Sequence, residues 1–191
     1  MFGQRKAIFV REQLNLLKLR DTYDLLDPDT QATLGQAKDE PAAWAKWMRL
    51  AVQKSMLPTT VSVYSQGGAS PVLRVHKRPA FLRTRLEIQD GAGRPLAGLQ
   101  SRLFTLGGSF RITDPQGQEM GELCGDWKGW DYSASLNGRP LGSVTKKWAG
   151  VLKEVFTSAD QYLVQADRAE DLPLMLGLAL AVDLVYKERQ S

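Results

Sequence analysis

Four segments of the chain share one plan: a short run of residues, a turn made of Asp, Asn, Gly or Pro, and a second short run. The turns are Asp27–Asp29, Asp90–Gly93, Asp114–Gly117 and Asn137–Gly138. Asn-Gly suits the positive φ angles of a type I′ turn, and Asp-Pro begins a type I turn. Apolar and polar residues alternate on the flanks, which is typical of strands with one buried face. The pattern therefore predicts an antiparallel meander that curls into a barrel or a sandwich.

The most apolar stretch is Leu172–Tyr186, which contains one charged residue, Asp183. A helix of this length would span about 22 Å, whereas the hydrocarbon core of a bilayer is about 30 Å thick. Its apolar residues occupy all faces of such a helix, which is typical of a helix surrounded by protein. Together with the meander, this stretch predicts a mainly β (α+β) fold in which a closed antiparallel barrel encloses a C-terminal helix.

A second helix is predicted over residues 41–55. There Trp44, Trp47 and Met48 fall on one face at helical spacing, whereas Lys46 lies elsewhere. We expect this amphipathic helix to lie on the barrel wall. The length of 191 residues suits one hydrophobic core, so the sequence predicts a single domain over residues 1–191.

The sequence contains no constellation typical of an enzyme. His76 is the one histidine, and Lys77 and Arg78 flank it, which disfavours its protonated form. Cys124 is the one cysteine, so no internal disulfide is possible, and its strand pattern indicates a small strand residue. We therefore expect a non-enzymatic protein with no cofactor, although lipid scrambling stays open.

Basic residues give the strongest functional signal, although the formal net charge is only +4. Alternation places Arg74, His76 and Arg78 on one face of a strand, and Arg83 with Arg85 on one face of the next. Paired strands would join them into a cationic patch, which is either a solvated strand face or a site for anionic headgroups or nucleic-acid phosphate. The candidate binding residues are Arg74, His76, Lys77, Arg78, Arg83, Arg85 and, from another strand, Lys146 and Lys147.

Three segments, Leu103–Phe110, Gly142–Gly150 and Glu154–Gln165, resemble the phospholipid scramblase family, and the apolar C-terminal helix with Asp183 is similar to that family's last segment. The N-terminal half resembles the related LURP-one proteins of the Tubby-like superfamily in its general β pattern. This resemblance implies a closed barrel of about twelve strands around a central hydrophobic helix. For the basic residues it implies binding to phosphoinositides or other anionic lipids.

The chain also departs from the family. A Pro-rich N-terminal arm and a cysteine cluster for acylation, which active scramblases carry, do not occur here. The family's calcium segment follows an Asp-x-Asp-x-x-Gly-like pattern, but Ser158–Leu163 keeps only Asp160 of it. Asp167, Glu170 and Asp171 could add carboxylates. Because a Ca²⁺ loop needs 6–8 oxygen ligands and usually a glycine, we do not expect a competent Ca²⁺ site.

These observations predict a cytoplasmic, non-enzymatic module that binds anionic phospholipid headgroups and associates peripherally with the inner face of the membrane. The first alternative is a phospholipid scramblase whose C-terminal helix spans the bilayer. Burying Asp183 at mid-bilayer would then cost at least ~2.5–3.5 kcal/mol. The second alternative is a nucleic-acid-binding regulator, although the strands lack interleaved aromatic residues for base stacking. The sequence leaves the oligomeric state open.

Overall fold

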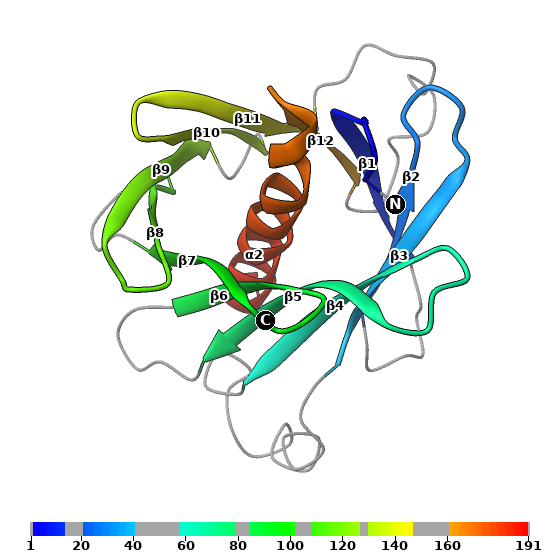
Figure 1. Cartoon of the computed structure of the whole chain (residues 1–191), viewed down its shortest axis with the longest axis horizontal. Coiled ribbons are helices and arrows are strands. Elements are labelled where there is room, and N and C mark those ends of the chain that lie inside the picture. The colour runs from blue at the N-terminus through cyan, green and yellow to red at the C-terminus, as the bar shows by residue number, and fades with distance from the viewer. Residues whose placement is uncertain are drawn as a thin grey trace.

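The computed structural model describes residues 2–13, 21–40, 58–78, 85–101, 108–126, 130–146 and 161–190. Twelve antiparallel strands form one closed barrel, and a helix runs through its centre (Figure 1). The strands are β1 (Ala7–Glu12), β2 (Thr22–Leu26), β3 (Thr33–Asp39), β4 (Thr59–Ser65), β5 (Pro71–Arg78), β6 (Arg85–Asp90), β7 (Pro95–Ser101), β8 (Phe110–Thr113), β9 (Glu119–Asp126), β10 (Asp131–Leu136), β11 (Arg139–Thr145) and β12 (Gln161–Ala166). The predicted helix over residues 41–55 falls outside the described residues.

The four predicted turns all connect neighbouring strands: β2 to β3, β6 to β7, β8 to β9 and β10 to β11. Asn137 and Gly138 have φ angles of 49° and 76°, which are the positive values that a type I′ turn requires. The meander is therefore confirmed. A further hairpin, between β4 and β5, was not predicted.

Closure of the barrel comes from the pairing of the first strand with the last. In this pair Ile8 lies opposite Val164, and Val10 lies opposite Tyr162. Every other strand pairs with its neighbours in the sequence, so the ring follows the order of the chain. The closed mainly β barrel that the sequence predicted is confirmed.

Because the strands alternate in direction, the confirmed hairpin turns all lie at one end of the barrel. The last residues of the odd-numbered strands, such as Glu12 and Arg78, lie at the other end. A short 3-10 helix, η2 (Ala169–Asp171), follows β12 at the hairpin end and leads into α2 (Leu172–Gln190). The C-terminal part of α2 reaches the opposite end, where Lys187 contacts Glu12.

Helix α2 is the core of the molecule. From Met175 to Tyr186 its residues are buried on all sides, and it contacts β5, β6 and β7 as well as β11 and β12. At Gly177 the helix approaches β6 so closely that an added Cβ would lie 2.7 Å from Cγ2 of Ile88. The prediction that Leu172–Tyr186 forms the barrel's core is confirmed. Among the described residues, no helix combines the length and the hydropathy needed to cross a bilayer.

One buried polar cluster interrupts this apolar core. The Tyr23 hydroxyl donates a hydrogen bond to Asp183, which is fully buried on α2. Lys187 lies one turn further on and donates to the Tyr23 oxygen at 2.9 Å and to Glu12 at 2.6 Å, while its Nζ lies 3.5 Å from the Asp183 carboxylate. These contacts tie α2 to β1 and β2 and neutralise the carboxylate that the sequence places in the apolar helix.

The cluster perturbs the ionisation of its members. Burial raises the pKa of Glu12, although Lys187 opposes that shift. Burial alone would lower the pKa of Lys187, but the carboxylates of Asp183, Glu12 and Asp21 together raise it. Burial and the neighbouring Asp183 raise the pKa of Tyr23 well above 10.0. Lys187 therefore stays charged, and Tyr23 stays neutral, at physiological pH.

Candidate anion-binding site

Strands β5 and β6 carry most of the predicted basic residues. Arg74, His76 and Arg78 point outwards from β5, as alternation predicted, and Val75 between them is buried. Arg78 is aligned directly with Arg85 of β6. Like charges in this position destabilise a sheet unless another group compensates them. The facing arginines therefore place two positive charges side by side on the outer wall.

Glu87 compensates one of the two arginines. Its carboxylate accepts a 2.6 Å hydrogen bond from Arg78, whose side chain is 65% exposed, while Glu87 is 23% exposed. Gln89 donates a second hydrogen bond to Glu87 at 2.7 Å. The hydrogen bonds from Gln89 and Arg78 lower the pKa of Glu87, so it remains a carboxylate at neutral pH.

Arg85 has no such partner. Its side chain is exposed at the start of β6, and within the described part of the chain it makes no hydrogen bond or ion pair. Its cross-strand neighbour on β7 is Gln100, a neutral amide that can donate or accept hydrogen bonds. The pair of arginines therefore has one compensated and one available guanidinium.

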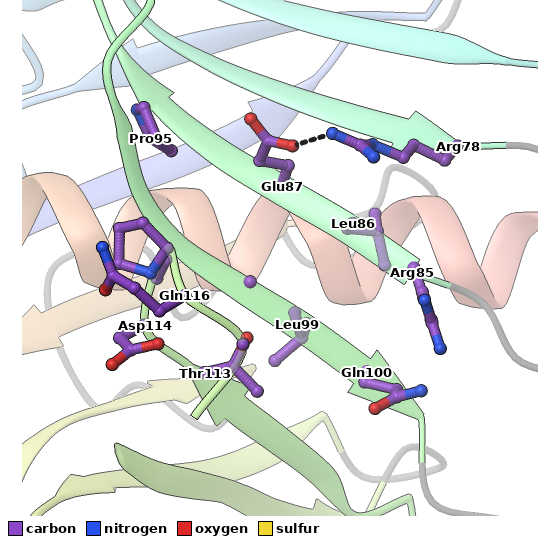
Figure 2. Close-up of a pocket in the computed structure, with 14 residues that line it drawn as sticks. Arg78, Arg85, Leu86, Glu87, Pro95, Leu99, Gln100, Thr113, Asp114 and Gln116 are labelled. Atoms are coloured by element: carbon purple, nitrogen blue, oxygen red, sulfur yellow. Dashed lines mark hydrogen bonds and ion pairs between the residues drawn. The ribbon is translucent and has the colours of Figure 1, made fainter. Parts of the chain in front are cut away.

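The two arginines line a groove of about 530 Å³ on the outside of the barrel. Figure 2 shows the Glu87 carboxylate directed towards Arg78, with Arg85 and Gln100 near the ends of their strands. The polar residues that line the rest of the groove come from the β8–β9 hairpin: Thr113, Asp114 and Gln116.

Gly98 keeps the groove open between β6 and β8. It is aligned with Glu87 on one side and with Thr113 on the other. A Cβ at Gly98 would lie 2.5 Å from the hydroxyl oxygen of Thr113, so a side chain there would collide with the neighbouring strand. The missing side chain leaves a space between the outward-pointing Glu87 and Thr113.

His76 lies beside the groove. Its Nδ1 is 2.8 Å from the hydroxyl oxygen of Thr60 on β4, and it is aligned with Glu87 on β6. Arg74 lies further towards the hairpin end, where it donates to the carbonyl oxygen of Gly91 at 3.3 Å. Both residues thus lie on the same outer face as the arginine pair, on the side towards the hairpin end of the barrel.

The remaining predicted basic residues do not join them. Lys77 is only 1% exposed, because it faces the barrel interior between its outward neighbours. Lys146 follows β11, which is on the opposite side of the ring from β5, and its Nζ lies 4.8 Å from the centre of the Trp130 ring. Arg83 and Lys147 lie outside the described residues.

Two of the four predicted carboxylates of the calcium-like segment pair with arginines. Asp171 accepts two hydrogen bonds from Arg139, at 2.7 and 3.2 Å, and Glu170 lies 3.6 Å from Arg168. Asp167 follows β12, and Asp160 is outside the described residues. In the described part of the chain, no group of three or more His, Cys, Asp or Glu residues could hold a metal ion.

Sequence reasoning missed the acidic and neutral half of the groove. Glu87 lies two positions after Arg85, so alternation places both on one face of the strand. The sequence alone could therefore have predicted Glu87 as a neighbour of the basic residues. Gln100 and Thr113 join the groove only through the pairing of β6, β7 and β8. No local pattern identifies them.

Residues 130–189 match the family model described as Scramblase. The predicted resemblance to the scramblase family is confirmed. The match covers β10, β11, β12 and α2, and the closed barrel around α2 agrees with the Tubby-like architecture that the resemblance implies. Neither the search of curated proteins nor that of solved structures found a match. The arginine groove lies outside the scramblase-like segment.

Proposed function

We propose that this scramblase-like protein is a non-enzymatic module that binds anionic phospholipid headgroups in the groove at Arg78 and Arg85. It would act peripherally, at the inner face of a cytoplasmic membrane. The observation that carries the proposal is the alignment of two arginines across β5 and β6, with Arg85 lacking a partner among the described residues.

The chemistry of the groove suits a phosphate group. A guanidinium presents its N–H groups in a planar fork that matches two phosphate oxygens, and such charge-assisted hydrogen bonds are stronger than neutral ones. A bound phosphate would also relieve the repulsion between Arg78 and Arg85. Beyond the arginines, Gln100, Thr113 and Gln116 offer donors and acceptors for the hydroxyl groups of a headgroup such as that of a phosphoinositide.

Lipid movement between leaflets is the second candidate, because the matched family model is described as Scramblase. In the structure, α2 supplies the core of the barrel, and Lys187 and Asp183 hold it to β1 and β2. Withdrawing this helix would expose its apolar surface and break the buried polar cluster. A fluorescent-lipid flip assay, with and without Ca²⁺, tests this candidate, and we expect no activity in either condition.

Flotation with vesicles tests the first candidate. We expect the protein to float with phosphatidylcholine vesicles that contain phosphatidate or a phosphoinositide, but not with phosphatidylcholine alone. Because the contact is electrostatic, binding should weaken as the salt concentration rises. Equal flotation with neutral and anionic vesicles would overturn the proposal. A salt-dependent shift with DNA, in the absence of vesicle binding, would favour the nucleic-acid alternative.

A further inference from the structure

We propose that Glu87 is an intramolecular competitor for the anion site: it occupies Arg78 until a phosphate headgroup displaces it. This inference rests on the proposed function and concerns the regulation of the same groove. Arg85 is then the point of first contact, and Arg78 is recruited only by a ligand with enough negative charge to replace the carboxylate.

The geometry supports a competitor role. Glu87 is the outward-facing residue next after Arg85 on β6, and its carboxylate binds the arginine that is aligned with Arg85. A phosphate that contacts both guanidinium groups must therefore take over the hydrogen bond that Arg78 now donates to Glu87. The Glu87 carboxylate therefore accepts the hydrogen bond that an oxygen of the bound phosphate would accept.

Glu87 is also held in this position. Gln89 binds the second carboxylate oxygen at 2.7 Å, and His76 is aligned with Glu87 on the neighbouring strand. On the other side, its neighbour is Gly98, which has no side chain. The space over Gly98 belongs to the groove, so the carboxylate can leave Arg78 without colliding with β7.

The charge of the ligand decides how well it competes. A phosphate monoester carries about −1.5 to −2 at neutral pH, whereas a phosphodiester carries a single charge. A monoester can therefore present charged oxygens to Arg85 and Arg78 together, which compensates for the lost contact to Glu87. The ligand class that gains most from the second arginine is a phosphate monoester, either on a membrane lipid or free in solution.

A mutant cycle tests the inference with phosphatidylcholine vesicles that contain phosphatidate. Glu87→Gln removes the charge but keeps the size and the hydrogen bonding of the side chain. Since an exposed ion pair contributes roughly 0.2–1 kcal/mol, we expect this variant to bind the vesicles about 1.4- to five-fold more tightly than wild type. In the Arg78→Gln background the same change should bring no such gain.

Glu119→Gln is the matched control. Glu119 pairs with Arg111 at 2.7 Å on the outer wall but does not line the groove. Each of the two variants replaces one glutamate with glutamine, so both change the net charge equally. The inference is overturned if Glu87→Gln increases the affinity for the vesicles no more than Glu119→Gln does. It is also overturned if the increase in affinity persists in the Arg78→Gln background. Should Glu87→Gln lower the thermal midpoint, Glu87→Asp retains the charge but shortens the reach to Arg78, and it should also raise affinity.

Two further arms separate this inference from the proposed function. Soluble glycerol 3-phosphate presents the same monoester without a membrane. If glycerol 3-phosphate shows the affinity changes expected for the mutant cycle while the protein does not bind vesicles, the competitor role of Glu87 stands and the proposed membrane binding is wrong. If vesicles bind through Arg78 and Arg85 but Glu87→Gln behaves like its control, only the competitor role fails. If neither probe binds the wild type, both fail.

Discussion

Lys187 donates a 2.6 Å hydrogen bond to Glu12, although the two residues lie 175 positions apart in the chain. This contact fixes the C-terminal part of α2 to the end of the first strand. At the other end of the barrel, Arg139 of β11 binds Asp171, which directly precedes α2. The apolar helix is therefore held by ion pairs at both of its ends as well as by its buried surface.

Replacing Lys187 with Met should lower the free energy of unfolding by about 2–4 kcal/mol, because it leaves the carboxylates of Glu12 and Asp183 in a buried site without their cation. Urea unfolding measures the loss. Lys38→Met is the control, since Lys38 is exposed on β3. Equal stability of the two variants would show that the Lys187 cluster contributes nothing to the fold.

Stability should fall steeply under alkaline conditions. The folded state raises the pKa of Tyr23 above 10.0 and that of Lys187 above 10.5, so above these values the unfolded chain loses its protons first. The native state then binds more protons than the unfolded state, and stability declines as the pH rises.

Urea unfolding at a series of alkaline pH values tests this effect. Tyr23→Phe should flatten the decline, because it removes one of the two groups of the buried cluster that titrate at alkaline pH. A control variant, Tyr64→Phe, changes a tyrosine on the outer wall, where the pKa is raised by the hydrogen bond to Glu40 rather than by deep burial. If Tyr23→Phe leaves the slope unchanged, the buried hydroxyl does not govern alkaline stability.

Gly177→Ala should destabilise the protein by about 1–3 kcal/mol, since the new methyl group would lie 2.7 Å from Ile88 in a packed core. The higher helix propensity of alanine, worth about 1 kcal/mol, offsets part of this cost. In the Ile88→Ala background the same change should become neutral or stabilising. Additive effects of the two substitutions would contradict the close packing of α2 against β6.

Calcium should neither bind nor stabilise the protein through Asp171. The guanidinium of Arg139 contacts both oxygens of that carboxylate, and a cation would have to displace it. Thermal unfolding with added Ca²⁺ or with a chelator should therefore give the same midpoint. A saturable stabilisation by Ca²⁺ that disappears in Asp171→Asn would contradict this expectation.

Local patterns predicted the parts of the fold that local chemistry determines. Asn137 and Gly138 identify a type I′ hairpin because few other residues adopt two successive positive φ angles. The all-round apolar character of Leu172–Tyr186 identifies a surrounded helix, which requires a barrel wide enough to hold it. The closing pair of β1 and β12 joins distant residues, such as Ile8 and Val164, and left no signal in periodicity.

The site was only partly predictable for the same reason. Alternation correctly placed Arg74 and Arg78 on one face, and it implied the opposite face for Lys77, which is buried. The alignment of Arg78 with Arg85 depends on the strand register, and the separation of Lys146 from them depends on strand order around the ring. Both are properties of the assembled barrel.

The most direct test of the central claim compares two double variants in flotation with vesicles that contain phosphatidate. Arg78→Ala/Arg85→Ala removes the facing pair, and Arg5→Ala/Arg168→Ala removes two exposed arginines beside β1 and β12, on the opposite side of the ring. Both variants lose the same charge. We predict that the first loses binding while the second keeps that of the wild type; equal binding by the two variants would contradict an anion site at Arg78 and Arg85.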